Sequence, residues 1–312
     1  MNSTSVGCSP PDAKSPSPPD KSIVIETLSN GHNIAYEEFG CAGGTPFFYF
    51  HDSGSSRIEA AFLHRAAKDH GYRLIALDRP GIGRSSYYAN ATAVHIAEDV
   101  VLLADCLNID QFGVLSLGSG GIFALTLAHQ YPGRVTRFVS LAGVPGTVFS
   151  ESCHRSQLSK TLARAVPALV KLLVRCRYGL LSDTPNKSMM RLFAELCLAD
   201  RKILSRPLIR STLALDQQEM MRQGSRGLAQ DMANCFRKLD FSLSEVTVPT
   251  TIWQGRADSL SQRADCEFMA SHLQSASFHR VSNAGHFFFI HSMDAVFSRL
   301  REHKSAITPL AA

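Results

Sequence analysis

The 312-residue chain has no run of about 18 apolar residues free of charge, which argues against a membrane span. It has no internal repeat and no glycine period, so solenoid and collagen-like folds are excluded. No glycine-rich phosphate loop, no dinucleotide fingerprint and no metal-ligand spacing stands out. We therefore expect no cofactor and no bound metal.

An excess of one charge sign is also small. The chain carries 32 Lys and Arg against 27 Asp and Glu, and this mild excess does not indicate a nucleic-acid partner. The eight cysteines are scattered without C-x-x-C pairs, as expected of reduced thiols in a cytosolic protein. Residues 1–22 hold five prolines and six serines but no basic or apolar segment of a signal peptide. We predict a disordered polar tail there and a cytoplasmic location.

From residue 23 onward, short apolar runs alternate with segments of helical periodicity. This alternation predicts an α/β fold with a mostly parallel sheet covered by helices on both faces. Residues 151–240 instead read as several helices without strands, which favours a helical lid over the sheet edge where ligands bind. The predicted organisation is a tail at 1–22, a core formed by 23–150 and 241–312, and a lid at 151–240.

Three polar motifs follow predicted strands in a particular order. The strand at 112–117 runs into Gly118-Ser119-Gly120-Gly121 and then a helix, Asp258 follows the strand at 250–253, and His286 follows the last strand. A sharp turn between strand and helix aims backbone N–H groups at a bound ligand. This order of turn, acid and histidine, with the helical insertion, resembles the α/β-hydrolase family over about residues 23–303. The resemblance implies that His286 is the base and Asp258 its acidic partner.

The chain departs from the family's G-x-S-x-G-G turn at its nucleophile. The two closing glycines place Gly118, which has no side chain, at the position of the serine. Two alternatives stay open. Ser116 would be the nucleophile in a register shifted by two residues, and Ser119 would be a nucleophile one residue past the turn, although its N–H suits an oxyanion donor better.

A second departure follows the strand at 46–50. The family usually has His-Gly there, and this chain has His51-Asp52. The N–H of Ser53 is the expected second oxyanion donor. A carboxylate at Asp52 would disfavour an oxyanion unless it is protonated or points away. The simpler interpretation is a turn residue that tolerates an unusual φ.

Three functions are compatible with these motifs. In the first, His286 and Asp258 form a dyad that acts as general base on a small carbonyl-containing substrate, in hydrolase, lyase or cyclase chemistry without covalent acyl transfer. In the second, the protein is a non-catalytic ligand-binding or interaction member of the family. In the third, it is a serine hydrolase with a displaced nucleophile at Ser116 or Ser119.

The positive charge is concentrated in the predicted lid. Residues 151–240 carry 16 Lys and Arg against 8 Asp and Glu, whereas the rest of the chain carries 16 against 19. A basic lid would steer an anionic or carrier-bound substrate toward the site beneath it.

Added salt should then raise the KM for such a substrate, as steady-state kinetics at varied ionic strength would measure. A KM that does not respond to salt would count against steering.

Overall fold

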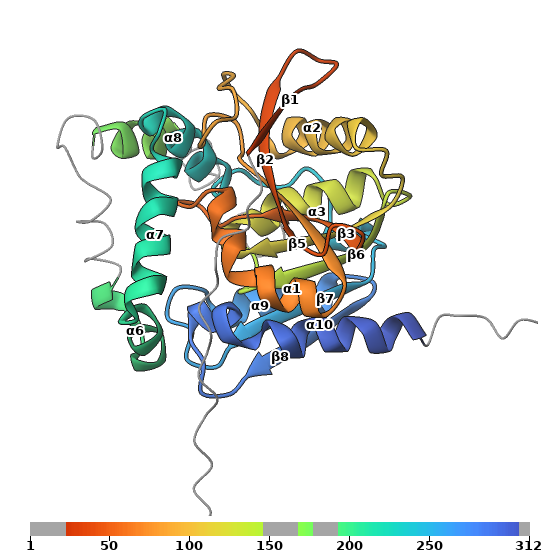
Figure 1. The fold of residues 1–312 in the computed structure, drawn as a ribbon, viewed down its shortest axis with the longest axis vertical. Helices are drawn as coiled ribbons and strands as arrows, with labels where there is room; N and C mark the ends of the chain where they lie inside the picture. The colour runs from red at the N-terminus through yellow and green to blue at the C-terminus, as the bar shows by residue number, and fades with distance from the viewer. Residues whose placement is uncertain (1–22, 146–167, 177–192, 306–312) are drawn as a thin grey trace, which may run out of the picture.

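The protein is described by a computed structural model that covers residues 23–145, 168–176 and 193–305. An eight-stranded sheet forms its centre, with strand order β1-β2-β4-β3-β5-β6-β7-β8 (Figure 1). β1 and β2 pair antiparallel, β2 also pairs antiparallel with β4, and the other neighbours are parallel. The strands are β1 (Val24–Thr27), β2 (Asn33–Gly40), β3 (Thr45–Phe50), β4 (Tyr72–Leu77), β5 (Phe112–Leu117), β6 (Val135–Leu141), β7 (Thr250–Gly255) and β8 (Ala276–Val281).

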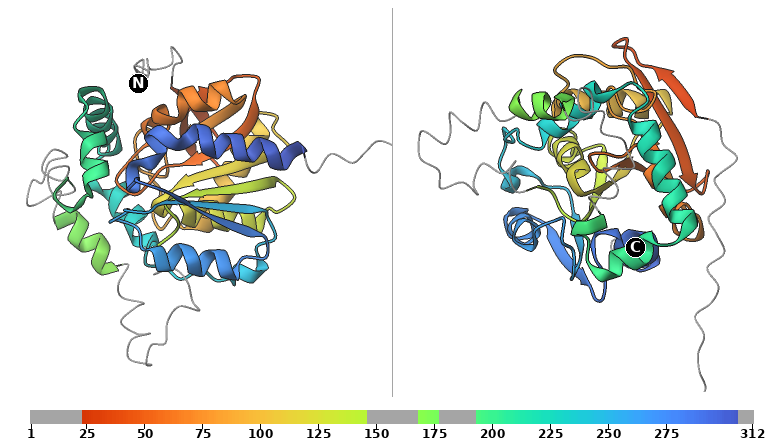
Figure 2. Two further views of the ribbon diagram at one scale, coloured as in Figure 1. Left: turned by 90° about the horizontal axis from the view of Figure 1, so that it is seen from below. Right: turned by 90° about the vertical axis from the view of Figure 1, so that its left-hand side faces the viewer.

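Helices lie on both faces of this sheet because successive strand residues point to opposite sides. In β4, Ile75 packs with the helices α2 and α3, whereas Leu74 packs with α1 and α10. Figure 2 shows the sheet between these two layers. The α-helices of the layers are α1 (His64–Asp69), α2 (Ala93–Cys106), α3 (Gly121–Gln130), α9 (Arg263–His272) and α10 (Phe289–Ser305). No helix in the described part of the chain has the length and apolar character needed to cross a bilayer.

The strand order creates a topological switch point at the carboxyl ends of β3 and β5. β3 lies between β4 and β5, so the chain leaves β3 in one direction and later returns on its other side. Loops diverge above the carboxyl ends of two such strands, and ligands bind in the crevice that they leave. The loop after β3 and the turn after β5 therefore meet at this edge.

A helical insert connects β6 to β7, and its described residues are 168–176 and 193–249. It includes α6 (Leu198–Leu204), α7 (Pro207–Met220) and α8 (Ser225–Asn234), which stand beside the switch-point edge (Figure 1). Short 3-10 helices occur at η1 (Arg57–Leu63), η2 (Gly118–Gly120), η5 (Leu243–Glu245) and η6 (His286–Phe288).

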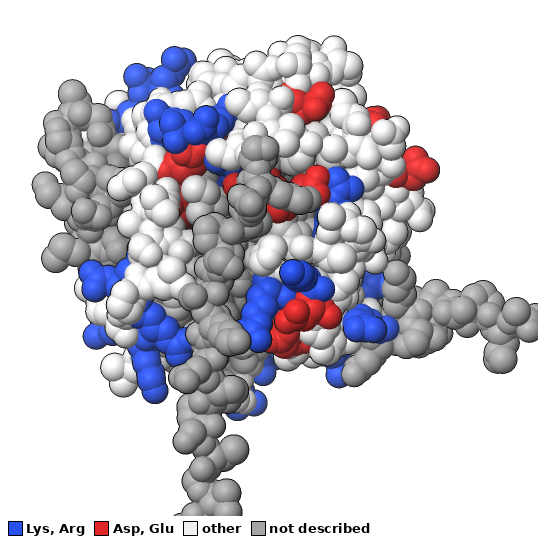
Figure 3. Space-filling view, viewed as in Figure 1, with Lys and Arg blue, Asp and Glu red and all other residues white. Residues whose placement is uncertain are grey.

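Buried carboxylates attach the insert to the loops below it. Asp231 of α8 accepts two hydrogen bonds from Arg79, at 2.6 and 2.8 Å, and both side chains are at most 3% exposed. Asp216 of α7 accepts from the N–H and the hydroxyl of Ser56, and Glu219 accepts from Arg57 at 2.8 Å. Because these acids face inward, the exposed surface of the insert is basic, and Figure 3 shows Lys and Arg gathered over α6 and near α8.

Several predicted elements have different boundaries. Helical spacing in the sequence predicts one helix over residues 57–70, but this segment begins as the 3-10 helix η1 and becomes α-helical only at His64. The apolar spacing also predicts one helix over residues 203–214, but two helices share this segment, because Pro207 cannot donate an N–H within a helix and instead begins α7. The sequence predicts a last helix that starts at 293, whereas α10 starts at Phe289. The predicted tail at 1–22 and the parts of the predicted lid at 151–167 and 177–192 lie outside the described residues.

The Arg79–Asp231 contact should dominate how firmly the insert is held. In Asp231→Asn the Arg79 cation stays buried with its partner charge removed, so the free energy of unfolding should fall by about 3–5 kcal/mol. The control is Asp69→Asn, which removes the exposed pair with Arg65 at 3.7 Å and should cost less than about 1 kcal/mol. Urea unfolding measures both, and equal losses would contradict the prediction.

Candidate active site

The turn between β5 and α3 has the geometry of a strand-to-helix elbow. Gly118 follows the strand directly and has a φ of +47°, a region that side chains disfavour. A Cβ at Gly120 would lie 2.4 Å from the carbonyl oxygen of Phe50, so the turn packs directly on the end of β3. Ser116 lies inside β5, fully buried, and its hydroxyl has no hydrogen-bond partner in the described structure. Ser116 as a nucleophile therefore finds no support in the structure, because its hydroxyl is closed off from solvent, 3.3 Å from where a Cβ on Gly121 would lie.

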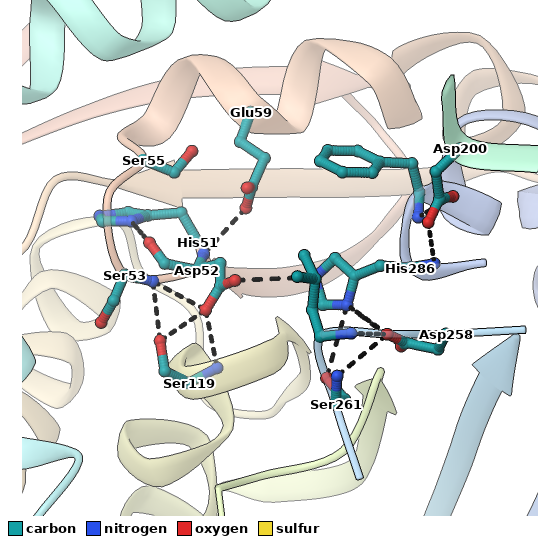
Figure 4. Close-up of polar contacts among 12 residues, drawn as sticks. His51, Asp52, Ser53, Ser55, Glu59, Ser119, Asp200, Asp258, Ser261 and His286 are labelled. Atoms are coloured by element: carbon teal, nitrogen blue, oxygen red, sulfur yellow. Dashed lines mark hydrogen bonds and ion pairs between the residues drawn. The ribbon is translucent and has the colours of Figure 1, made fainter. Parts of the chain in front are cut away.

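Asp52 projects its carboxylate over this turn (Figure 4). Its Oδ1 accepts from the N–H of Ser53 at 2.8 Å, the N–H of Ser119 at 2.8 Å and the hydroxyl of Ser119 at 2.6 Å. A Cβ placed on Gly118 would lie 2.7–2.9 Å from the carboxylate atoms of Asp52. The carboxylate therefore occupies the space that a side chain at position 118 would need.

The interpretation of Asp52 as a turn residue with an unusual φ is wrong. It is not among the residues with positive φ, and in its loop it is Gly54 that takes this conformation, with a φ of +89°. The Asp52 side chain also points into the site rather than away from it, because the two backbone N–H groups expected to serve an oxyanion bind it instead. Ser119 is equally engaged, since its hydroxyl donates to Asp52 and accepts from the N–H of Ser53 at 2.7 Å.

His286 and Asp258 come together as expected. Nδ1 of His286 lies 3.1 Å from Oδ2 of Asp258, while Oδ1 of Asp258 accepts from the N–H groups of Leu260 and Ser261. The Asp258 carboxylate thus binds the backbone of the turn that follows it with one oxygen and the imidazole with the other. The arrangement leaves Nε2 of His286 facing the turn after β5, and 3.7 Å separates it from Oδ2 of Asp52.

Two carboxylates therefore flank one imidazole. Burial opposes the cationic form of His286, but the hydrogen bonds and charges of Asp258 and Asp52 raise its pKa to about 10. Burial would raise the pKa of Asp52, yet hydrogen bonding and charge from His286 and the donors of Ser119 lower it overall. At neutral pH the resting site therefore holds an imidazolium next to an ionised Asp52.

A cavity of about 370 Å³ opens above these groups. Asp52 and His286 line it together with Gly118 and apolar side chains that include Val144 and Leu260. The Asp52 side chain keeps 29% of its surface exposed, whereas that of His286 keeps 5%. Asp52 is therefore the more accessible of the two groups to a molecule in the cavity. No group of three or more His, Cys, Asp or Glu among the described residues is arranged to hold a metal ion.

Two acids that the sequence did not single out support the site. Asp200 of α6 accepts from the backbone N–H groups of His286 and Phe287, at 2.8 and 3.0 Å, and so fixes the histidine loop. A Cβ on Gly285 would lie 2.2 Å from Oδ2 of Asp200, so only glycine permits this approach. Glu59 of η1 accepts the N–H of Asp52 at 3.0 Å. Neither acid belongs to a local motif, so no pattern in the sequence identifies its partner.

The geometry agrees with the comparison to known protein families. The model of the alpha/beta hydrolase fold family matches residues 51–292, well over half of the chain. The protein belongs to this family. A 3-oxoadipate enol-lactonase of Acinetobacter baylyi is 27% identical over 221 residues, which cover 71% of this chain and 74% of the lactonase. A non-heme chloroperoxidase of Streptomyces lividans is 34% identical over 123 residues, which cover 38% of this chain and 44% of the peroxidase.

Solved structures share the whole fold. A thermophilic esterase from Thermogutta terrifontis has a TM-score of 0.68 and 20% identity, over 92% of this chain and 99% of the esterase. At this identity the likeness shows the fold alone. The predicted α/β-hydrolase fold, with its mostly parallel sheet and helices on both faces, is therefore confirmed.

The charge of Asp52 should control the protonation of His286. Replacing it in Asp52→Asn removes one of two flanking anions and should lower the pKa of His286 from about 10 by about 1–3 pH units. NMR titration of the His286 ring measures this pKa directly. The pKa of His286 in the folded protein lies above its usual 6.5. The stabilisation of the fold by the His286 cation is therefore complete below about pH 6.5 and disappears as the pH rises through about 10.

The control for this titration is Asp69→Asn, which removes an exposed acid of α1. It should leave the His286 midpoint unchanged. A His286 midpoint that is the same in wild type and Asp52→Asn would show that the two groups are not coupled.

Proposed function

We propose that the protein is a hydrolase that acts on a small-molecule substrate without a serine nucleophile, with His286 and Asp258 as its acid–base pair. The observation that carries this proposal is the carboxylate of Asp52 filling the space beside Gly118, 3.7 Å from Nε2 of His286. We take Gly118 as the position that holds the nucleophile in related enzymes. The acid–base pair of His286 and Asp258 is then kept, while Asp52 takes the space of the nucleophile's side chain.

The charges give the order of proton transfers. His286 holds a proton at neutral pH, so its first role in a reaction is that of a general acid. Once it has given this proton away, the imidazole oriented by Asp258 acts as a general base toward water. This order modifies the expectation of a histidine that is neutral and basic from the start.

Related proteins support a small-molecule substrate. The enol-lactonase and the esterase are named for cleaving lactones and esters, and the cavity of about 370 Å³ suits a compact molecule. An anionic substrate would also be drawn by the basic surface of the helical insert, which we interpret as a lid. We place the protein in the cytoplasm and assign it no cofactor.

A second candidate function is ligand binding without turnover. It is favoured by the same ion pair, because both expected oxyanion donors and Nε2 of His286 are already engaged with Asp52 in the resting structure. Such a protein would hold an anion or a polar ligand in the cavity and release it unchanged.

Exchanging the two unusual residues tests whether the site keeps the layout of a hydrolase. The double variant Asp52→Gly/Gly118→Ser frees the donors of Ser53 and Ser119 and supplies a hydroxyl next to His286. It should hydrolyse p-nitrophenyl acetate at least about 10²-fold faster than wild type, a small part of the roughly 10⁶-fold contributed by a triad serine. A fluorophosphonate probe should then label the serine introduced at position 118.

The matched control is Gly118→Ser alone, which should gain nothing because its side chain meets the Asp52 carboxylate. Adding His286→Ala to the double variant should abolish the gain. Fluorophosphonate labelling of Ser119 in the wild-type protein would contradict the proposal and restore the displaced-serine alternative. A folded double variant that neither turns over nor reacts with the probe would favour the ligand-binding function.

A further inference from the structure

The two oxygens of Asp52 have different surroundings. Oδ1 is held by three donors from Ser53 and Ser119, whereas Oδ2 faces Nε2 of His286 at the cavity wall. Figure 4 shows the carboxylate between these two groups. We propose that Asp52 is a nucleophile, and that its Oδ2 attacks an electrophilic saturated carbon, that of an epoxide, to form an ester on the enzyme. This inference rests on the proposed function and names its substrate class.

The position of Oδ1 separates this chemistry from acyl transfer. Attack on a carbonyl needs donors at the substrate oxygen, and here the two backbone donors already bind Asp52. Displacement at a saturated carbon develops no oxyanion on a carbonyl, so it needs no such hole at the attack step. The donors of the oxyanion hole instead bind the carboxyl group of Asp52. This arrangement favours an alkylating substrate over a carbonyl compound.

In the first step, an electron pair on Oδ2 of Asp52 forms a bond to an epoxide carbon, and the ring C–O bond breaks. The electron pair of that bond goes to the ring oxygen, which takes the proton from Nε2 of His286. The products of this step are an alcohol, an ester on Asp52 and a neutral imidazole. Alkylation removes the charge of Asp52, and with it one of the two anions that raise the pKa of His286.

In the second step, neutral His286 takes a proton from water, and the oxygen of that water bonds to Cγ of Asp52. The negative charge develops on Oδ1, where the N–H groups of Ser53 and Ser119 and the Ser119 hydroxyl already point. Collapse breaks the Cγ–Oδ2 bond, and the departing diol oxygen takes the proton from His286. The new carboxyl proton then returns to His286, so that epoxide and water yield a diol and the resting site.

Gly118 and the cavity wall fit this assignment. A Cβ at position 118 would lie 2.7 and 2.9 Å from the two oxygens of Asp52, so glycine keeps this space free for the carboxylate, which lines the cavity. Val144 and Leu260 provide apolar surface for the carbon skeleton of a substrate. The exposed 29% of the Asp52 side chain gives the substrate a path to the nucleophile.

Isotope labelling in a single turnover tests the nucleophile. Wild-type protein in excess over styrene oxide in H₂¹⁸O should yield diol without ¹⁸O, while the tryptic peptide that contains Asp52 gains one ¹⁸O. Heavy oxygen in the diol instead would mean that His286 activates water directly on the substrate. That result would overturn the nucleophile and leave the acid–base pair of the proposed function standing. No diol would overturn the epoxide assignment, whatever the fate of the hydrolase proposal in the residue-exchange test.

A trapping experiment separates the two steps. The variant His286→Gln cannot activate water, and a bromide leaving group needs no proton, so phenacyl bromide should alkylate Asp52 and the ester should accumulate on its tryptic peptide. The same adduct should be absent from His286→Gln/Asp52→Asn and present in His286→Gln/Asp69→Asn. Thermal unfolding checks that each variant is folded. A folded His286→Gln protein without an adduct on Asp52 would contradict the proposal.

Discussion

The site depends on one steric and electrostatic constraint, which is that the carboxylate of Asp52 and a side chain at position 118 cannot share the same space. A glycine at 118 leaves room for the carboxylate, which accepts from the two N–H donors and lies beside the imidazolium. Asp52 and Gly118 are therefore one structural feature. A negative side chain from the loop after β3 occupies the space next to Gly118 in the turn after β5.

The rest of the site is arranged around that charge. His286 balances Asp52 and Asp258 together, and its backbone is held in turn by Asp200 from the helical insert. Glu59 holds the backbone of Asp52, and burial, with the nearby charges of Asp216 and Asp52, raises the Glu59 pKa to about 8. Asp216 and Asp231 join the insert to the same loops. The geometry of the candidate site and the attachment of the insert thus share one buried polar network.

Much of this could be predicted from the sequence because the signals are local. Apolar runs of strand length, the glycine-rich turn after β5, and the acid and histidine that follow β7 and β8 each depend on a few neighbouring residues. The predictions failed where distant contacts decide. A turn conformation was expected of Asp52, but its side chain is oriented by Ser119, which lies 67 residues away. The role of Asp200 depends on a contact across 86 residues.

The amino-acid sequence was enough to predict the family fold, the glycine at position 118 and the pairing of His286 with Asp258, because strand order and motif order leave few arrangements of the sheet. The direction of the Asp52 carboxylate became apparent from the contacts in the folded protein. Its direction depends on donors, steric space and an imidazolium contributed by three separate loops, and the free energy of a buried carboxylate is set by those neighbours rather than by its own residue type.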